Sequence, residues 1–240
     1  MKVLGVIPAR YSSTRFPGKP LIDLKGKSMI QRVYEGAQQA TLLDTLVVAT
    51  DDQRIYDEVR RFGGQVVLTR SDHQSGTERC AEVLTHFTDH DTIINIQGDE
   101  PLVSGQQLDQ LLGAFADPTV QIATLVHPDV SVEDLQNVNR IKVLEDHHCN
   151  AIYFSRSALP NMHYAQNPDF PWLRHIGLYA YKSEVLSHLA GLTPCALEQA
   201  ESLEQLRWLY YGYAIRLIHT DIETPNIDVP ADLEKVLPFL

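Results

Sequence analysis

Residues 3–20, VLGVIPARYSSTRFPGKP, combine an expected strand with a loop typical of phosphate binding, and the other segments of the chain are interpreted in relation to this loop. The segment opens with an apolar run long enough for one buried strand, and Pro8 is expected to end that strand. The loop that follows carries cations, hydroxyls and a glycine, all suited to phosphate: Arg10, Ser12, Ser13, Thr14, Arg15, Gly18 and Lys19. Hydroxyls and backbone N–H groups donate to phosphate oxygens while Arg and Lys neutralise charge, so the loop is typical of a triphosphate site. The alternative is an ordinary polar surface loop.

The charge of the whole chain strengthens the phosphate interpretation. The 240 residues carry a formal net charge of -11, which argues against a general nucleic-acid binder. The first 35 residues nevertheless hold seven Lys and Arg against two Asp and Glu. Positive charge is therefore concentrated near the loop, and a small anionic substrate fits this distribution better than a polyanion does.

The cysteines indicate the cellular compartment. Cys80, Cys149 and Cys195 are far apart and form no CxxC pair. This spacing predicts neither a disulfide framework nor a zinc site, and it is typical of a reducing compartment. The N-terminal apolar run is too short for a signal peptide, and no segment reaches the roughly 18 apolar residues of a membrane span. We therefore expect a cytoplasmic protein without a membrane segment.

Short apolar strands alternate with helical patterns over the first part of the chain. Strands are expected at 46–50, 65–69 and 92–97, with helices at 29–40, around 55–62 and after 79. The alternation predicts an α/β fold with a doubly wound, mostly parallel sheet. Polar segments at 10–19, 71–79 and 97–101 each follow a strand. We expect them to share the carboxyl edge of the sheet, where such folds bind ligands.

The pattern changes in the second half. Residues 141–144 and 151–155 predict an antiparallel hairpin, and residues 173–181, LRHIGLYAY, a third strand of the same layer. We expect a small mixed or antiparallel layer at residues 135–185, inserted in a single domain that spans residues 1–240. An apolar segment at 122–126, an acidic helix around 132–135, a helix at 198–210, a strand at 215–218 and a helix at 230–237 complete the expected elements.

Two aspartates are candidate ligands for Mg²⁺. Asp99, in QGDEP, directly follows an expected strand, and Asp228, in NIDVP, comes from the last segment. Mg²⁺ takes one or two carboxylates together with phosphate oxygens and water. Bound there, it would neutralise the α-phosphate and the leaving pyrophosphate. Alternatively, Asp99 caps a turn and Asp228 caps the helix that begins at Pro230.

The expected strand at 173–181 offers pocket residues. His175 and Tyr179 fall on the same face, Gly177 between them leaves space, and Arg174 falls on the other face. A strand histidine is also commonly a hydrogen-bonded core group.

Three further residues are candidates for a sugar site. Arg156 ends the segment YFSR and would anchor a carboxylate, while Glu204 and Gln205, in LEQLR, would reach hydroxyls. Otherwise Glu204 and Gln205 belong to an ordinary solvated helix face.

Seven blocks of sequence together resemble the CMP-Kdo synthetases, the 3-deoxy-manno-octulosonate cytidylyltransferases, which are related to the CMP-sialic acid synthetases. The blocks are IPARYSSTRFPGKPL, VVATDD, DHQSGTER, NIQGDEPL, AIYFSR, LRHIGLYAY and LEQLR. They extend from Ile7 to Arg207, and the GxGxxG motif of dinucleotide-binding dehydrogenases is absent from the first loop.

The resemblance implies a nucleotidyltransferase fold and attack of a sugar-acid hydroxyl on the α-phosphate of CTP, giving a CMP-sugar and pyrophosphate. It implies a homodimer with the 135–185 layer at the interface, and a product used in lipopolysaccharide synthesis. The implied site residues fall into three groups: Arg10, Ser13, Arg15 and Lys19 for the phosphates with Ser75 and Arg79 around the cytidine; Asp99 and Asp228 for Mg²⁺; and Gln97, Arg156, His175, Tyr179, Glu204 and Gln205 for the sugar.

The sequence departs from the family pattern at a few positions. In NIDVPADL, Asn226, Val229 and Ala231 stand where the family commonly has Gly, Thr and Glu, and Cys149 stands where it usually has Gly. These changes leave both Kdo and its 8-amino analogue, in which an ammonium replaces the terminal hydroxyl, as candidate sugars.

Two alternatives belong to other classes. A nucleotidyltransferase acting on a sugar phosphate would need more cations in the sugar pocket than Arg156, Arg174 and Lys182 supply. A nucleotide-binding sensor without turnover would be favoured by loss of Lys19, Asp99 or Asp228, and all three are present.

Overall fold

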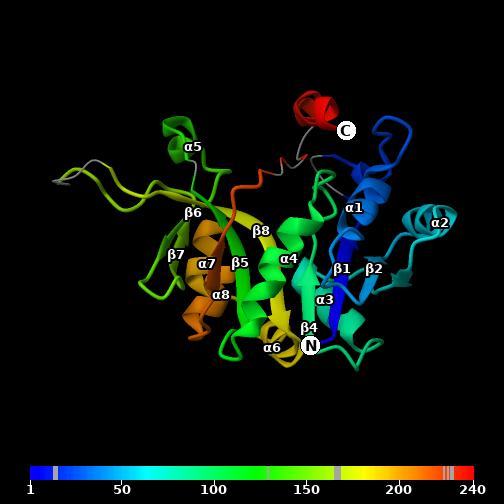
Figure 1. Cartoon of the computed structure of the whole chain (residues 1–240), viewed down its shortest axis with the longest axis horizontal. Helices are drawn as coiled ribbons and strands as arrows, with labels where there is room; N and C mark the ends of the chain where they lie inside the picture. Colours follow the sequence, from blue (N-terminus) through cyan, green and yellow to red (C-terminus); the bar gives the residue numbers. More distant parts are fainter. Residues whose placement is uncertain (13–15, 129, 165–168, 224, 226, 228–229) are drawn as a thin grey trace.

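The computed structural model describes residues 1–12, 16–128, 130–164, 169–223, 225, 227 and 230–240. In these residues a nine-stranded sheet runs through the molecule in the order β3-β2-β1-β4-β8-β5-β9, and β6 pairs with β7 and β8 (Figure 1). The strands are β1 Val3–Ala9, β2 Thr45–Thr50, β3 Val66–Leu68, β4 Thr92–Asn95, β5 Ile122–His127, β6 Lys142–Glu145, β7 Ala151–Ser155, β8 Leu173–Lys182 and β9 Arg216–His219.

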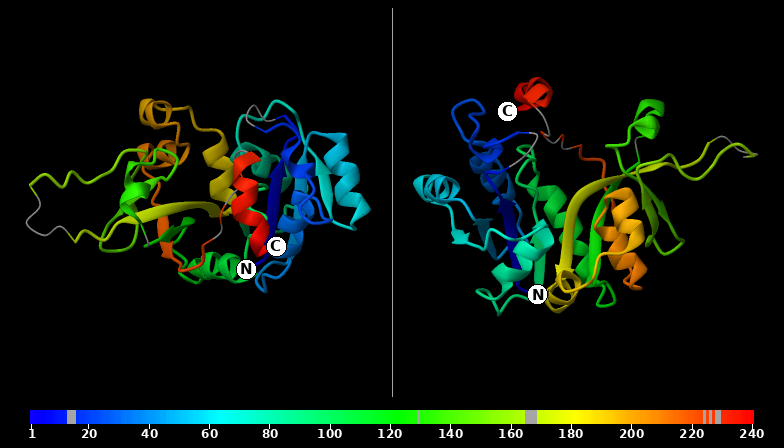
Figure 2. Two further views of the ribbon diagram at one scale, coloured as in Figure 1. Left: turned by 90° about the horizontal axis from the view of Figure 1, so that it is seen from above. Right: turned by 180° about the vertical axis from the view of Figure 1, so that it is seen from behind.

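Helices cover both faces of this sheet (Figure 2). One core contains apolar residues of α1, α2 and α4, and the other contains residues of α3, α6 and α8. The helices are α1 Met29–Ala37, α2 Gln53–Arg61, α3 Gly76–Leu84, α4 Gly105–Gly113, α5 Val132–Gln136, α6 Ser183–Ala190, α7 Ala196–Glu201, α8 Gln205–Tyr210 and α9 Leu233–Val236, with 3₁₀ turns η1 Lys19–Leu21, η2 Ala114–Ala116, η3 Pro230–Asp232 and η4 Leu237–Phe239. The α/β prediction is confirmed. None of the helices in the described ranges has the length and apolar character needed to cross a membrane.

The strand β8 corrects the prediction for residues 173–181. It lies between β4 and β5 in the central sheet, antiparallel to both, and only Leu173 and Arg174 pair with β6. A strand buried on both sides needs a nearly continuous apolar sequence, which LRHIGLYAY provides. The β6–β7 hairpin is antiparallel as predicted and is attached to the sheet through the first residues of β8.

Three further corrections concern element boundaries. Strand β1 continues through Pro8 because β4, which pairs with β1 as far as Val6, ends at Asn95. The nitrogen of Pro8 faces the side on which that ladder has ended, so its missing N–H costs no ladder bond. The expected helix at 198–210 is divided into α7 and α8 at Ser202, whose φ of 51° is left-handed. The closing helix at 230–237 is also divided, into η3, α9 and η4.

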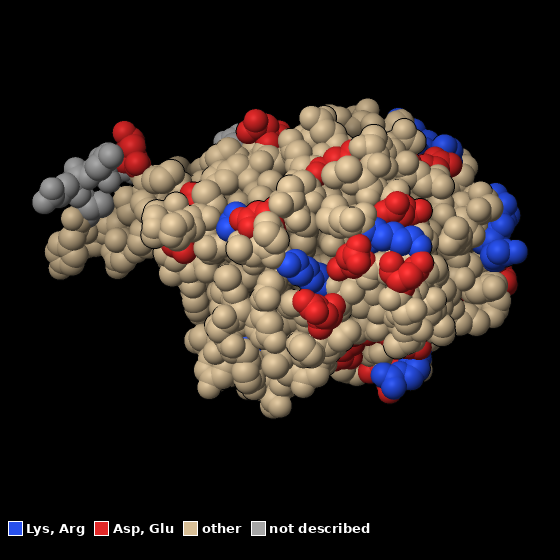
Figure 3. All heavy atoms as spheres, turned by 60° about the horizontal axis from the view of Figure 1, so that its bottom comes forward, with Lys and Arg blue, Asp and Glu red and all other residues tan. Residues whose placement is uncertain are grey.

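The carboxyl end of β1 carries the N-terminal loop, and the C-terminal turn of helix lies above it, at the opposite end of the sheet from the N-terminus (Figure 1). On the face drawn in Figure 3, basic and acidic side chains alternate and form no large basic area. The described parts of the connection between β7 and β8 extend away from the body (Figure 2).

Gly105 allows the packing of α4 against the backbone of residues 39–40 to be tested. It is the first residue of α4, and a Cβ placed on it would lie 2.4 Å from the backbone carbon of Gln39 and 2.5 Å from the nitrogen of Ala40. Since backbone cannot move aside as a side-chain end can, Gly105→Ala is expected to lower the free energy of unfolding by about 3 kcal/mol, measured by urea denaturation. Gly113→Ala, at the other end of α4 with nothing within 4 Å of the added Cβ, is the matched control. Equal urea midpoints for the two variants would contradict the close contact of Gly105 with the backbone of Gln39 and Ala40.

Candidate active site

Two adjoining pockets open at the carboxyl edge of the sheet. The first has a volume of about 250 Å³ and is lined by the end of β1, Lys19 and the start of α3. The second has a volume of about 440 Å³ and lies between β8 and α8. Both pockets are lined by Pro8, Gly76, Gln97 and Asp99. The polar segments predicted to share one edge therefore meet there, with Asp99 at the junction of the two pockets.

Lys19 ties the N-terminal loop to two distant segments. Its Nζ donates to Oδ2 of Asp99 and to the carbonyl of Ile227, each at 2.7 Å. The amide of Ile227 in turn donates to the carbonyl of Asp99 at 3.0 Å. Gly18 allows the turn before Lys19, because its φ of 73° lies in the left-handed region that glycine adopts without steric cost. The site thus joins the first, middle and last parts of the chain.

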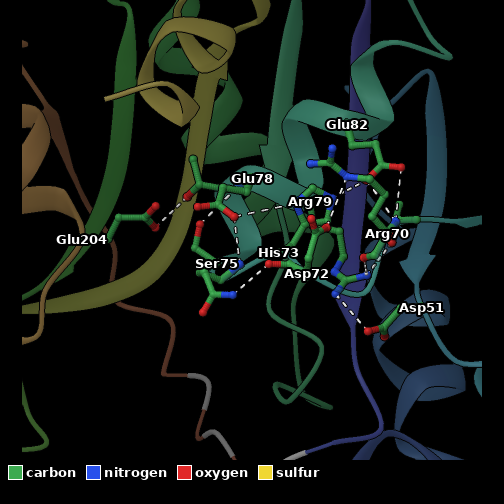
Figure 4. Close-up of polar contacts among 12 residues, drawn as sticks. Asp51, Arg70, Asp72, His73, Ser75, Glu78, Arg79, Glu82 and Glu204 are labelled. Carbon is green, nitrogen blue, oxygen red and sulfur yellow. Dashed lines mark hydrogen bonds and ion pairs between the residues drawn. The ribbon is translucent and has the colours of Figure 1, made fainter. Parts of the chain in front are cut away.

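The start of α3 forms the opposite wall of the first pocket. Ser75 caps this helix by accepting a hydrogen bond from the amide of Glu78, and a helix N-terminus favours anionic ligands. Arg79, one turn on, is 4% exposed. Its guanidinium donates to Thr69 and faces Asp51 at 3.5 Å (Figure 4). Arg79 therefore positions the strand ends at the pocket wall. Arg10, by contrast, is exposed at the same pocket.

The second pocket brings together five of the residues predicted for a sugar. Gln97 donates to the carbonyl of Gly177 at 3.0 Å, and the ring centroids of His175 and Tyr179 are 5.3 Å apart. Glu204 accepts a hydrogen bond from the hydroxyl of Thr77 at 2.8 Å. The break between α7 and α8 places Glu204 and Gln205 at the start of α8, where both line this pocket. The five are Gln97, His175, Tyr179, Glu204 and Gln205.

Burial controls the protonation of this pocket. It raises the pKa of Glu204, and it raises the pKa of Glu100 to about 8, with the neighbouring Asp99 adding to the effect. Burial also lowers the pKa of His175 to about 3, with Arg174 contributing. The pocket therefore presents a neutral imidazole and a protonated Glu100 at neutral pH.

Several lining residues of the second pocket were missed from the sequence. Four of their buried polar atoms make no hydrogen bond within the described part of the chain: Asn95 Oδ1, Glu100 Oε2, the hydroxyl oxygen of Tyr181 and Trp208 Nε1. Glu100 lies beside Asp99 in GDEP, which was the available signal. Arg174 was expected on the other strand face, yet it also lines the pocket while contacting Glu223 at 2.9 Å. Arg174 is the second residue of β8, in the part of the strand that pairs with β6 and not with β4.

The structure does not bring Arg156 to either pocket. Its guanidinium donates to the carbonyls of Glu201 at 2.6 Å, Val138 at 2.9 Å and Ser202 at 3.2 Å. These backbone acceptors hold it against the end of α7. Of the remaining predicted residues, Ser13, Arg15 and Asp228 lie outside the described residues.

Comparison with known proteins identifies the family. The family model described as cytidylyltransferase matches residues 4–220. The chain belongs to the cytidylyltransferase family. It is 52% identical to the 3-deoxy-manno-octulosonate cytidylyltransferase of Bacteroides thetaiotaomicron over 100% of this chain and 98% of that protein, and 50% identical to that of Parabacteroides distasonis with the same coverage. The cytidylyltransferase is also 43% identical to a CMP:2-keto-3-deoxy-manno-octonic acid synthetase solved in complex with CTP, with a TM-score of 0.94 over 100% and 98% of the two chains.

His175 makes the stability of the cytidylyltransferase depend on pH. Its pKa is about 3 when folded, against an ordinary value of 6.5. Between these values the unfolded chain binds more protons, so the free energy of unfolding falls as the pH drops from about 6.5 toward 3. Replacing His175 by glutamine, which keeps a donor for Thr124, is expected to reduce the difference between urea midpoints at pH 7.5 and pH 5.

The matched control for this measurement is His188→Gln, at an exposed histidine on α6. It should keep the pH dependence of the unmodified cytidylyltransferase. If the pH dependence of the urea midpoint were unchanged in His175→Gln, His175 would not be its source.

Proposed function

We propose that this cytidylyltransferase activates Kdo, 3-deoxy-manno-octulosonate, with CTP to give CMP-Kdo and pyrophosphate. The observation that carries the proposal is the pair of adjoining pockets that share Gln97 and Asp99. Two substrates bound side by side there would have their reacting groups at Asp99. The names of the relatives, which are cytidylyltransferases of this sugar acid, support the choice of substrate.

The first pocket would hold the nucleotide. Lys19 and Arg10 would neutralise phosphate oxygens, together with Ser13 and Arg15 from the loop between them. Ser75 and Arg79 would lie around the cytidine, with Arg79 acting mainly by fixing the wall. This arrangement would hold the α-phosphate next to Asp99.

The second pocket would hold the sugar acid. Its Asn95, Glu100 and Trp208 atoms, which have no partner among the described residues, and the side chain of Gln205 suit a ligand that carries many hydroxyls. The anomeric 2-hydroxyl oxygen would form a bond to the α-phosphorus, and the bond from that phosphorus to the leaving pyrophosphate would break. The chain would contribute mainly by positioning both groups.

Asp99 also fits the expected Mg²⁺ in its chemistry. It offers carboxylate oxygen at the junction of the pockets, and Mg²⁺ prefers oxygen ligands shared between carboxylates and substrate phosphates. Asp228 would be the second ligand, and it follows Ile227, whose amide contacts Asp99. When bound, Mg²⁺ would neutralise charge on the α-phosphate and the pyrophosphate.

The 8-amino analogue of Kdo is the second candidate sugar. Glu100 favours it, because an ammonium beside its carboxyl oxygen, which has no partner within the described residues, would lower the pKa of Glu100, and the resulting carboxylate would accept charged hydrogen bonds from the ammonium. If Glu100 does so, Glu100→Gln should lower kcat/KM for the amino sugar by about tenfold or more while leaving Kdo little changed.

The deciding assay measures pyrophosphate release with CTP and either Kdo or its 8-amino analogue. Release with one or both sugars is expected, and the ratio of kcat/KM values identifies the substrate. Omitting the sugar and replacing CTP by UTP are the controls. Absence of release with both sugars would defeat the proposal and favour a nucleotide-binding sensor.

We further propose a cytoplasmic homodimer with the 135–185 layer at its interface. The three cysteines are free, as in a reducing compartment. On the layer, Ile152 of β7 is 57% exposed and Val138 is 58% exposed, which is apolar surface suited to a partner. Light scattering on the unmodified protein and on Ile152→Lys tests the dimer: the first should have twice the chain mass and the second should dissociate.

A further inference from the structure

Three side chains capable of binding metal lie together outside both pockets. They are Glu145 at the end of β6, Cys149 in the following turn and His219 at the end of β9. One ligand atom from each lies within 4.8 Å of the others. None of the three lines either pocket of the candidate active site.

The geometry of the trio is close to that of a metal site. Nε2 of His219 is 2.9 Å from Oε2 of Glu145. Two such ligands on a tetrahedral zinc ion are roughly 3.3 Å apart, and a thiolate lies roughly 3.6 Å from each of them. To hold zinc, the Glu145 and His219 ligand atoms need to separate only slightly, and the thiol of Cys149, which lies within 4.8 Å of both, needs to approach by at most about an ångström. Rotations of these partly exposed side chains supply that movement.

Backbone hydrogen bonds hold the two contributing segments in register. The amide of Leu217 donates to the carbonyl of Cys149 at 2.7 Å, and the amide of Ala151 donates to the carbonyl of Ile215 at 2.8 Å. Within the turn, Asp146 Oδ1 accepts from the amide of Asn150 at 2.8 Å. The ligands are therefore brought together before any ion binds, which lowers the entropic cost of binding.

Cys149 has an unusual backbone conformation. Its φ of 58° is left-handed, which costs a residue other than glycine about 1–2 kcal/mol. Glycine would fit the turn better, so Cys149→Gly removes the thiol without threatening the fold. This makes the position well suited to an experiment.

We propose that Glu145, Cys149 and His219 bind a divalent transition metal, with zinc the ion that their chemistry favours. Thiolate, imidazole and carboxylate are all zinc ligands, and a thiolate disfavours Mg²⁺ and Ca²⁺. A metal held there joins the β6–β7 hairpin to β9 and stabilises the folded chain, because it binds the folded state preferentially. Sequence spacing does not reveal the trio, since His219 is 70 residues beyond Cys149.

Titration with Co²⁺, followed by optical spectroscopy, tests the proposal directly. The unmodified protein should show a thiolate-to-metal charge-transfer band that saturates at one equivalent of Co²⁺, and Cys149→Gly should lose that band. Competition by Zn²⁺ then gives its affinity, which Glu145→Gln and His219→Gln should each weaken on the order of 100-fold. His188→Gln, at an exposed histidine on α6, is the matched control and should bind normally.

Thermal denaturation supplies a second readout. Zn²⁺ should raise the Tm of the unmodified protein and of His188→Gln but not that of Cys149→Gly. If Cys149→Gly does not fold, Cys149→Asn takes its place, because asparagine tolerates the left-handed conformation. A Co²⁺ complex without a thiolate band, or a Zn²⁺ affinity in the folded Cys149 variant within a few-fold of the original, overturns the proposal.

Discussion

Replacing Asp99 by alanine is expected to lower kcat for pyrophosphate release about 10³-fold. The carboxylate lies where the two pockets meet and is the partner of Lys19. Loss of a group that stabilises charge in the transition state by about 4 kcal/mol corresponds to this factor. The KM for CTP should change much less, because the lost interaction acts mainly in the transition state.

The control for this variant is Asp57→Ala, which removes an exposed carboxylate from α2. It should retain full activity. Circular dichroism and Tm should show that Asp99→Ala remains folded, since Asp99 is part of a pocket wall and not of the apolar cores. A variant with more than a tenth of the original kcat would remove Asp99 from the mechanism.

Replacing Lys19 by methionine is expected to lower kcat/KM for CTP about 10²-fold. Methionine keeps the apolar stem but loses the ammonium that donates to Asp99 and to the carbonyl of Ile227. Hydrogen bonds from a charged donor contribute about 1.5–3 kcal/mol each, and about 3 kcal/mol corresponds to a hundredfold change. Contacts with the phosphates would be lost as well.

Two measurements separate the roles of Lys19. Faster hydrogen exchange at the amide of Ile227 would report loss of the tie to the C-terminal segment, and a raised KM for CTP would report loss of phosphate binding. Lys27→Met, at a lysine paired with Glu35 outside both pockets, is the matched control. Unchanged kcat/KM in Lys19→Met would contradict the assignment of the first pocket to the nucleotide.

Much of the fold could be predicted because its signals are local. Apolar runs that end in polar segments gave β1, β2 and β4 and placed Lys19, Ser75 and Asp99 at one edge. The position of β8 was not accessible in this way, because an apolar strand fits equally well beside β6 or between β4 and β5. Only packing against both neighbours, which is a long-range property, decides between them.

The sugar residues show the same limit. His175, Tyr179, Glu204 and Gln205 were found through short motifs and the period of a strand, and they do line one pocket. Arg156 was assigned by its charge and by the resemblance of its segment to the family, and the structure gives its guanidinium backbone partners instead. The acceptors of a cationic side chain depend on tertiary contacts. No pattern in the segment YFSR indicates that the Arg156 guanidinium will donate to carbonyl groups at the end of α7 instead of to a substrate carboxylate.

The hydrogen bond between Lys19 and the carbonyl of Ile227 also has a consequence for folding during synthesis on the ribosome. It joins residues 208 positions apart. At a synthesis rate of about 5–20 residues per second, the N-terminal loop emerges roughly 10–40 s before its last partner is added. Nascent chains still on the ribosome should therefore build most of the sheet and yet have no working enzyme. A chain that stops shortly before residue 227 is therefore expected to contain all nine strands but to lack the bond between Lys19 and Ile227, and we expect it to have no activity.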